Sequence, residues 1–296
     1  MTAVGAEETG DIRDQVDRIL SDLSRPEPPL SLPDVRALLK LDLGYYSSSD
    51  TTLVDDVVHA IRMAGMGLVR NPTRLWTVIK ERRLCALWLP ERRQILIDQE
   101  EPTARHRWME GHEIVHGLIP WHKEFLHGDA THTLDPSCHA VIEAEANFGA
   151  GQLLFLGSRF RQDASDLPFT MANVQVMSKR YANSLASTLW RMVEERDPHH
   201  VSFGLVSAHP KQKKIRPNGD GPPVRHFITS PAFRAQLPAV AGEHAYGILR
   251  RHVTWSSKGP VMHVDDVLPD ANGELRRFNV ESFCTGHAVL TRGIAI

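Results

Sequence analysis

Residues 112–116 read His-Glu-Ile-Val-His, and this pentapeptide constrains the fold of the chain more than any other segment. A helix is expected independently over about residues 104–118. Positions i and i+4 of a helix share one face, so the imidazoles of His112 and His116 can reach the same metal ion, with Glu113 beside it. The chain has 16 histidines in 296 residues, so a chance match has a probability of about a few per cent. The pentapeptide alone therefore predicts half of a zinc site.

A catalytic zinc ion also needs a third protein ligand and an open position for water. A second helix, predicted over about residues 138–156, offers Glu143 and Glu145. These carboxylates point roughly 200° apart around the helix, so only one can face the metal. Asn147 lies at i+4 from Glu143, where its amide can accept a hydrogen bond from the non-ligating N–H of a zinc-bound histidine. We therefore predict Glu143 as the ligand, Asn147 as its supporting neighbour, and Glu145 as a solvated acid or one that contacts the ligands from outside.

Two separate motifs within residues 104–156 resemble the ImmA/IrrE family of zinc metallopeptidases. The family pattern is H-E-x-x-H followed by E-x-x-A-N-x-F-A and Leu-Leu-Met-Pro, and this chain has IEAEANFGAGQLLF at the second motif. Phe148 stands one position away from the aromatic residue of the family motif. This difference affects the expected substrate pocket more than the expected metal site. Weaker similarity extends over roughly residues 35–195. The resemblance implies Glu113 as the catalytic glutamate and one Zn²⁺ with three ligands, which are His112, His116 and Glu143.

A mechanism follows from this ligand set. Zinc lowers the pKa of its bound water towards about 7 and polarises a peptide carbonyl, while Glu113 takes the water's proton and passes it to the leaving amine. In similar zincins the strand before the helix is an edge that pairs with extended substrate, a role predicted here for Gln94–Asp98. His139 and Tyr181 are the candidate donors to the developing oxyanion.

The predicted fold class is α+β, with three regions along the chain. Residues 1–30 are acidic and then rich in proline and serine, which predicts a tail or loosely docked arm with at best one short helix. Residues 31–198 are the predicted zincin-like metallopeptidase domain, a set of helices with a small sheet around the H-E-x-x-H helix. Residues 199–296 contain short apolar runs between glycines and prolines, which predicts a mixed C-terminal region with β-strands.

Local patterns predict further elements. Residues 84–98 contain two short apolar runs around a Pro-Glu-Arg-Arg turn, which indicates a hairpin. From Thr170 onward apolar residues recur at helical spacing until Pro198, which predicts a third helical stretch. Residues 180–184 resemble a break between two helices in the family, with Ser184 as the N-cap of the second.

Composition argues against several classes of protein. Lys and Arg number 34 against 36 Asp and Glu, so no overall field attracts nucleic acid or an anionic membrane, and the basic run at residues 211–216 is interpreted as a solvated loop. No run of about 18 apolar residues occurs and the N-terminus does not resemble a signal peptide, so neither membrane insertion nor export is expected. The cysteines Cys85, Cys138 and Cys284 lie far apart, which favours a reducing cytoplasm.

Seven of the histidines lie within residues 106–139. Because three ligands are already supplied, the loop histidines are interpreted as solvated residues or as residues at the rim of a substrate site. These are His122, His127 and His132.

Two functions remain open. The first is an active zinc endopeptidase that cleaves a protein partner, which the resemblance implies to be a transcriptional repressor or similar regulator of helix-turn-helix type, in stress response, mobile-element control or defence. The second is a non-proteolytic regulatory or ligand-sensing protein on a peptidase scaffold, with zinc mainly for stability. Glu113 favours the first, because a purely structural site has no need of a general base. The region after residue 198 is expected to select substrate or sense a signal.

Overall fold

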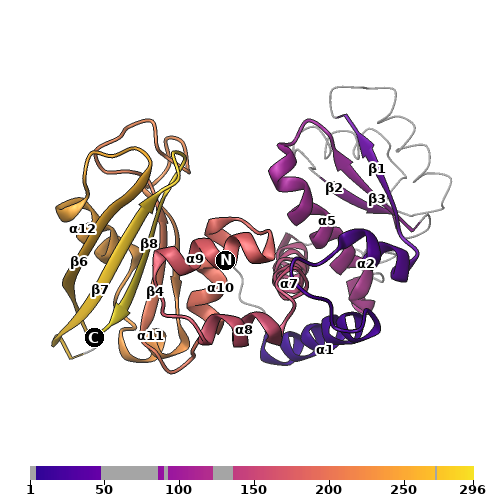
Figure 1. The fold of residues 1–296 in the computed structure, drawn as a ribbon, viewed down its shortest axis with the longest axis horizontal. Helices are drawn as coiled ribbons and strands as arrows, with labels where there is room; N and C mark the ends of the chain where they lie inside the picture. The colour runs from indigo at the N-terminus through magenta and orange to yellow at the C-terminus, as the bar shows by residue number, and fades with distance from the viewer. Residues whose placement is uncertain (1–4, 48–85, 90–92, 123–135, 271) are drawn as a thin grey trace. The chain divides into compact units, whose positions relative to one another are not determined.

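The chain forms two compact units, each with its own helices and sheet (Figure 1). The first unit is Met1–Gly157 and the second is Ser158–Ile296. This mixture of helices and two sheets is consistent with the predicted α+β class. The parts of the chain that the computed structural model describes are residues 5–47, 86–89, 93–122, 136–270 and 272–296.

A three-stranded sheet lies beside helix α5 (Thr103–Leu118), which carries the H-E-x-x-H pentapeptide. Its strands, in spatial order, are β1 (Asp42–Tyr46), β3 (Gln94–Asp98) and β2 (Ala86–Leu89). Strands β2 and β3 are antiparallel, with Leu87 opposite Leu96, so the predicted hairpin is confirmed. Strand β1 runs parallel to β3 on its other side. The prediction that Gln94–Asp98 forms a substrate-binding edge is wrong, because β3 is the central strand.

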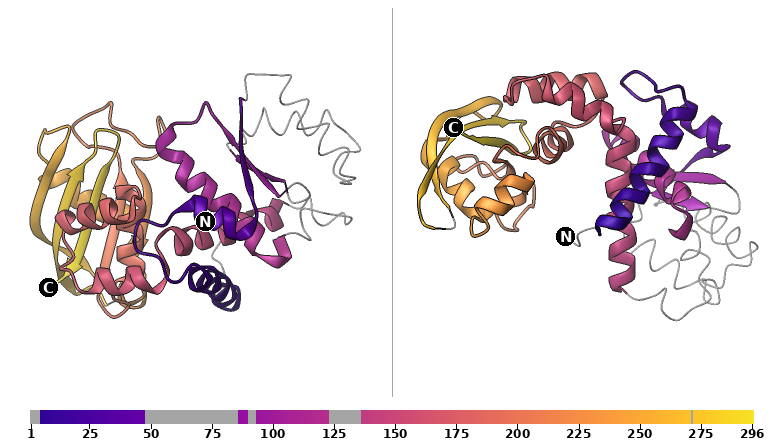
Figure 2. Two further views of the ribbon diagram at one scale, coloured as in Figure 1. Left: turned by 45° about the vertical axis from the view of Figure 1, so that its right-hand side comes forward. Right: turned by 90° about the horizontal axis from the view of Figure 1, so that it is seen from below.

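Helix α7 (Pro136–Leu154) packs against both α5 and α1 (Ala6–Asp22) (Figure 2). It begins and ends two residues before the predicted helix over residues 138–156. Helix α2 (Leu32–Leu39) also belongs to this unit, and its residue Arg36 pairs with Glu110 of α5 at 2.7 Å.

The N-terminal segment is part of the core of the first unit. Ile12, Val16 and Leu20 recur every four residues along α1, and at most 6% of any of them is exposed. Such spacing produces an apolar stripe on one helix face, which packs against α7. The prediction of a tail or loosely docked arm over residues 1–30 is therefore wrong for the described residues, because this stripe outweighs the acidic composition around it.

The second unit is built on a five-stranded sheet whose neighbouring strands are all antiparallel. These strands lie where the sequence predicts a β-containing region. In spatial order they are β5 (Val224–Thr229), β4 (Ser202–Ser207), β8 (Val289–Ala295), β7 (Leu275–Cys284) and β6 (Gly259–Pro269).

Four helices of the second unit pack against its sheet, and α8 (Ser158–Ser165) packs against one of them, α10. The four are α9 (Met171–Tyr181), α10 (Leu185–Glu195), α11 (Pro231–Gln236) and α12 (Gly242–His252). The predicted break between two helices near residues 180–184 is present. Ala182 adopts a left-handed conformation with φ 51°, and the hydroxyl of Ser184 accepts a hydrogen bond from the backbone N–H of Ser187. Ser184 is thus the N-cap of α10.

Strand β4 is buried on both faces, and this burial moves the domain boundary. Phe203 and Leu205 lie in an apolar cluster with residues of α11 and α12. Gly204, on the opposite face, lies against α10, and a methyl group added there would be 3.1 Å from Cγ2 of Val193. The predicted boundary after residue 198 is wrong, because α10 belongs to the core of the second unit.

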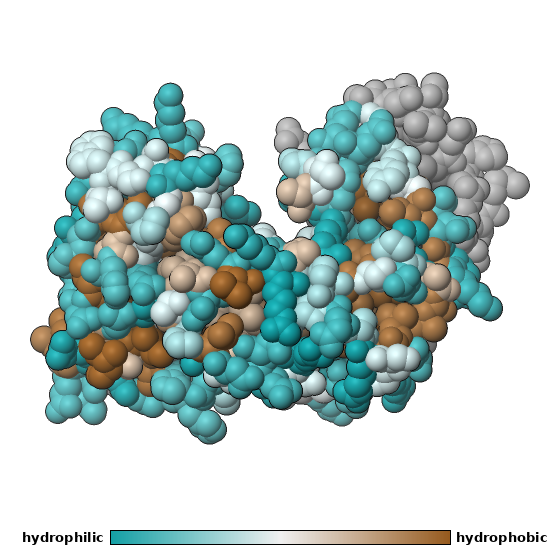
Figure 3. Space-filling view, viewed as in Figure 1, coloured by the Kyte–Doolittle hydropathy of each residue, from teal (hydrophilic) through white to brown (hydrophobic). Residues whose placement is uncertain are grey.

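On the face drawn in Figure 3, polar side chains cover most of the surface and apolar side chains form smaller patches. Large apolar side chains that are exposed include Trp255 and Leu275 of the second unit. None of the helices in the described part of the chain combines the length and apolar character needed to cross a lipid bilayer.

Gly149→Ala should lower the free energy of unfolding of the first unit by about 1–3 kcal/mol, the usual cost of overpacking. The added methyl would lie 2.6 Å from Cγ1 of Val115 and 3.0 Å from Cγ2 of Ile12, so α5 or α1 would have to move. Urea denaturation followed by circular dichroism measures the change. Gly10→Ala is the matched control, because nothing lies within 4 Å of its Cβ and the change should be neutral or stabilising. Equal destabilisation at both positions would contradict the described packing.

Candidate metal centre

Three potential metal ligands meet where α5 packs against α7. His112 and His116 lie one turn apart on α5, and Glu143 lies in the first half of α7. One ligand atom from each residue lies within 4.8 Å of the other two. The structure therefore brings together the three residues that the sequence predicts as ligands, and they form a possible metal-binding group.

The spacing of the two imidazole nitrogens and the two oxygens of Glu143 suits a tetrahedral zinc ion. Bonds of about 2.0–2.1 Å at the tetrahedral angle place two ligand atoms about 3.3–3.4 Å apart. Nε2 of His112 lies 3.1 Å from Nε2 of His116 and 3.3 Å from Oε2 of Glu143. Nε2 of His116 lies 3.6 Å from Oε1 of Glu143. Two imidazoles and one carboxylate are also a ligand set of catalytic zinc sites, which keep a fourth position for water.

Two glycines allow the ligand-bearing helices to approach closely. A methyl group at Gly111 of α5 would lie 3.0 Å from Cδ1 of Leu154 on α7, and Gly149 of α7 lies against Val115 of α5 in the same way. Because neither glycine has a side chain of its own, Leu154 and Val115 pack directly onto the backbone of the facing helix, and this close packing brings the Glu143 carboxylate within reach of both histidines.

The cluster is open to solvent on the side of Glu143. The exposed fraction of the Glu143 side chain is 41%, against 8% for His116. Burial by itself would raise the pKa of Glu143, but hydrogen bonds and charges from His112 and His116 outweigh it and hold this pKa well below its usual range. The carboxylate is therefore ionised at neutral pH and available as a ligand.

Asn147 lies beside His112, because it follows Glu143 by four residues and so shares its face of α7. Its Nδ2 donates a hydrogen bond to the backbone oxygen of Glu143 at 2.7 Å. Burial disfavours the protonated form of His112, yet hydrogen bonding to Glu143, the charges of Glu113 and Glu143, and a hydrogen bond to Asn147 together raise its pKa. Asn147 thus contacts both a ligand side chain and the backbone of another ligand.

Glu113 lies beside the ligands and is only 8% exposed. The backbone N–H of Trp88 in β2 donates a hydrogen bond to its carboxylate. Burial raises the pKa of Glu113, although the charges of His112 and His116 oppose the shift. A buried carboxyl group with a raised pKa next to a candidate metal site is suited to accepting and returning a proton.

His122 and Glu145 form a second polar layer behind the ligands. The sequence interpretation left this role open for Glu145 and missed it for His122. Nδ1 of His122 lies 3.0 Å from Nδ1 of His116, and Nε2 of His122 lies 2.8 Å from Oε2 of Glu145. The same carboxylate oxygen accepts a hydrogen bond from Nε1 of Trp121 at 2.7 Å. The interpretation of His122 as a solvated or rim residue is wrong, because its side chain is completely buried. Burial lowers the pKa of His122 to about 4, with a further contribution from nearby His116, so the ring is neutral at pH 7.

Tyr181 does not have the predicted environment of an oxyanion donor. It lies in α9 of the second unit, is completely buried, and donates its hydroxyl hydrogen to Oδ2 of Asp163 at 2.7 Å. Burial and this contact with Asp163 raise the pKa of Tyr181. The predicted catalytic role is therefore wrong, since the hydroxyl already has a carboxylate partner within that core.

Other predicted residues lie outside the described part of the chain. His127 and His132 are among them, as is Cys85. His139 is in the first turn of α7, but its side chain is not described, so its role as an oxyanion donor stays a prediction.

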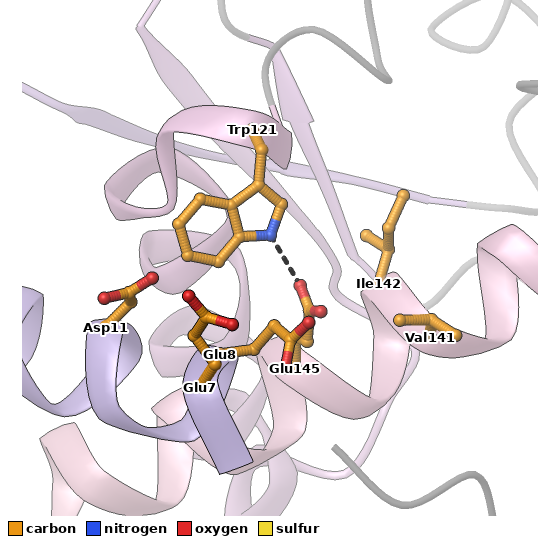
Figure 4. A pocket seen from close by; sticks show the side chains of 7 residues that line it. All are labelled: Glu7, Glu8, Asp11, Trp121, Val141, Ile142 and Glu145. Carbon is orange, nitrogen blue, oxygen red and sulfur yellow. Dashed lines mark hydrogen bonds between the residues drawn. The ribbon is translucent and has the colours of Figure 1, made fainter. Parts of the chain in front are cut away.

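A cavity of about 350 Å³ lies between α1 and the start of α7, on the Glu145 side of the second layer (Figure 4). Its lining includes none of the three candidate ligands. The lining residues are Glu7, Glu8, Asp11, Trp121, Val141, Ile142 and Glu145.

The fold is similar to that of a solved protein described as a Mycobacterium tuberculosis transcriptional regulator. The TM-score is 0.50 at 10% sequence identity, and the similarity covers 96% of this chain and 87% of that one. At this identity the likeness concerns the fold alone. No protein-family model matches the sequence, and no curated protein matches it.

His116→Ala should remove most of the zinc bound by the purified chain, because it deletes one of three ligands. Elemental analysis after zinc loading and desalting measures the metal content. His106→Ala is the matched control on the same helix, because Nε2 of His106 contacts the backbone oxygen of Glu101 at 2.8 Å and takes no part in the cluster. Full zinc retention by His116→Ala would show that the ion is held elsewhere.

Zinc affinity should fall as the pH is lowered towards and below the ordinary histidine pKa of 6.5. Protonated His112 cannot act as a ligand, and its pKa is raised, so protons compete with zinc at a higher pH than at an ordinary histidine. Metal binding releases this proton, and affinity is therefore greatest above the raised pKa. Chelator-competition titrations between about pH 5 and pH 8 test this. An affinity that does not change over this range contradicts ligation by His112.

Proposed function

We propose that the chain is a zinc-dependent endopeptidase that cleaves a specific protein partner, a transcriptional regulator of helix-turn-helix type. The observation that carries the proposal is the buried carboxyl group of Glu113 beside three ligands whose cluster is open on one side. A purely structural zinc site is usually closed by four protein ligands and needs no base. The arrangement therefore favours hydrolysis over a scaffold that uses the ion only for stability.

Each residue has a defined task in this proposal. His112, His116 and Glu143 would hold the ion, which when bound lowers the pKa of water and polarises the carbonyl of the substrate. Glu113 would accept a proton from the attacking water and donate it to the leaving amine. The backbone N–H of Trp88 would keep the carboxyl group of Glu113 oriented during both steps.

An extended substrate would lie along β2 rather than β3. Among the described strands β2 is at an edge of the sheet, and it packs against α5. Its residue Trp88 donates its backbone N–H to Glu113, so this strand is next to the proposed base. Extended peptides bind to exposed strand edges through main-chain hydrogen bonds. Pairing along β2 would bring a scissile peptide bond close to Glu113.

The choice of a regulator as substrate rests on the resemblance of residues 104–156 to the ImmA/IrrE family. The fold shared with a transcriptional regulator agrees with a regulatory setting. Within the proposal the reaction takes place in the cytoplasm, and the second unit selects the substrate or responds to a signal, because a peptidase there needs restraint. The second unit has its own sheet and core and supplies none of the three candidate ligands.

Glu113→Gln should retain one zinc ion per chain and lose proteolysis by about 10²–10⁴-fold, because the amide preserves the shape of the side chain but cannot accept the proton of water. The measurement is cleavage of candidate regulators encoded beside the gene, followed by mass spectrometry. Glu110→Gln is the matched control on the same helix, since Glu110 pairs with Arg36 away from the ligands. Wild-type turnover by Glu113→Gln would exclude the proposed chemistry, whereas a zinc-loaded wild-type chain that cleaves no regulator would argue for the sensing alternative.

A further inference from the structure

A continuous line of buried side chains runs from the metal cluster to Glu145. The ring of His116 presents Nε2 to His112 and Glu143, and it presents Nδ1 to the ring of His122 at 3.0 Å. The far nitrogen of His122 then reaches Oε2 of Glu145 at 2.8 Å. The three residues of this line, His116, His122 and Glu145, are 6%, 0% and 4% exposed. Little water can therefore substitute for any of these contacts.

Hydrogen-bond chemistry allows one arrangement of protons along this line when His116 is a metal ligand. A ligating Nε2 must present a lone pair, so the neutral ring of His116 carries its hydrogen on Nδ1. Nδ1 of His122 must then accept that hydrogen bond, which leaves the hydrogen of His122 on Nε2. Nε2 in turn donates to the carboxylate of Glu145. Every polar atom on the line is satisfied in this arrangement.

Glu145 is itself held in place. Its Oε2 accepts a second hydrogen bond, from Nε1 of Trp121, as Figure 4 shows. The carboxylate is the acceptor at the end of the line, and its negative charge favours the tautomer of His122 that has the hydrogen on Nε2. Because Glu145 and Glu143 lie on the same helix, α7 supplies both a ligand and the support for another ligand.

We propose that His122 and Glu145 are positioning residues that hold His116 in the tautomer and ring orientation required for metal binding. The proposal rests on the metal centre of the proposed function. A carboxylate, a backbone carbonyl or a water molecule usually accepts the hydrogen bond from a metal-bound histidine directly. Here the support passes through a second imidazole, so loss of Glu145 should weaken metal binding although this residue contacts no ligand.

The first experiment measures zinc dissociation constants by chelator competition for the full chain and two variants. Glu145→Gln keeps the shape and an acceptor oxygen but removes the charge, and it should weaken zinc binding by about tenfold or more. Trp121→Phe removes the other hydrogen bond to the same oxygen but leaves the line intact, and it should change the affinity by less than about threefold. Equal losses in the two variants would overturn the proposal, because they would indicate a general packing effect.

The second experiment compares replacements at His122. His122→Leu removes both contacts and should weaken zinc binding by about 10- to 100-fold. His122→Gln offers an acceptor and a donor on one side chain, so it should recover part of the lost affinity. Recovery supports a hydrogen-bonding role, whereas equal affinities of the Leu and Gln variants would contradict it.

A third experiment measures the histidine tautomers in the wild-type chain, so its result does not depend on how the variants fold. Histidine-selective ¹⁵N NMR of the zinc-loaded protein should show hydrogen on Nδ1 of His116 and on Nε2 of His122. A hydrogen on Nδ1 of His122 would overturn the proposal while leaving the metal centre intact. A wild-type chain that binds no stoichiometric zinc would overturn the metal centre, and this inference with it. Stoichiometric zinc together with unchanged affinity in Glu145→Gln would overturn the inference alone.

Discussion

At the crossing of α5 and α7, Gly111 and Gly149 have no side chain of their own, so Leu154 and Val115 pack directly onto the facing backbone. This close contact determines how far the carboxylate of Glu143 must extend to reach the two histidines. It also places Glu145 opposite His122. The candidate ligands and the buried layer behind them thus depend on the same helix packing.

Much of the candidate site was predictable because helical periodicity is a local property. The i, i+4 spacing of His112 and His116 places both on one face. The opposed directions of Glu143 and Glu145 allow only one of them to face the metal, and the position of Asn147 favours Glu143, which lies in the cluster. The order of residue types likewise predicted the approximate ends of α5, the hairpin of β2 and β3, and the N-cap at Ser184.

What the sequence could not indicate depended on contacts between distant segments. His122 lies six residues after His116, beyond the end of α5, and no periodicity relates the two rings. The acidic composition of α1 obscured the helical spacing of its apolar residues. No local pattern identifies β3 as a central strand, because its second neighbour in the sheet, β1, lies about fifty residues earlier in the chain. Tyr181 occupies a helical apolar stripe, which is typical of a core residue, and its hydroxyl partner Asp163 comes from a different helix.

The contact of Gly149 with both Ile12 and Val115 joins α1, α5 and α7 into one packed layer. An ion held between α5 and α7 would act on this layer as a reversible cross-link. A ligand at 100 times its dissociation constant stabilises the folded state by about 2.7 kcal/mol, which is a large share of the stability of an ordinary domain. Unfolded chains are removed by cellular proteases, so a gain of this size changes steady-state abundance. The supply of zinc would then govern how much of this protein a cell contains.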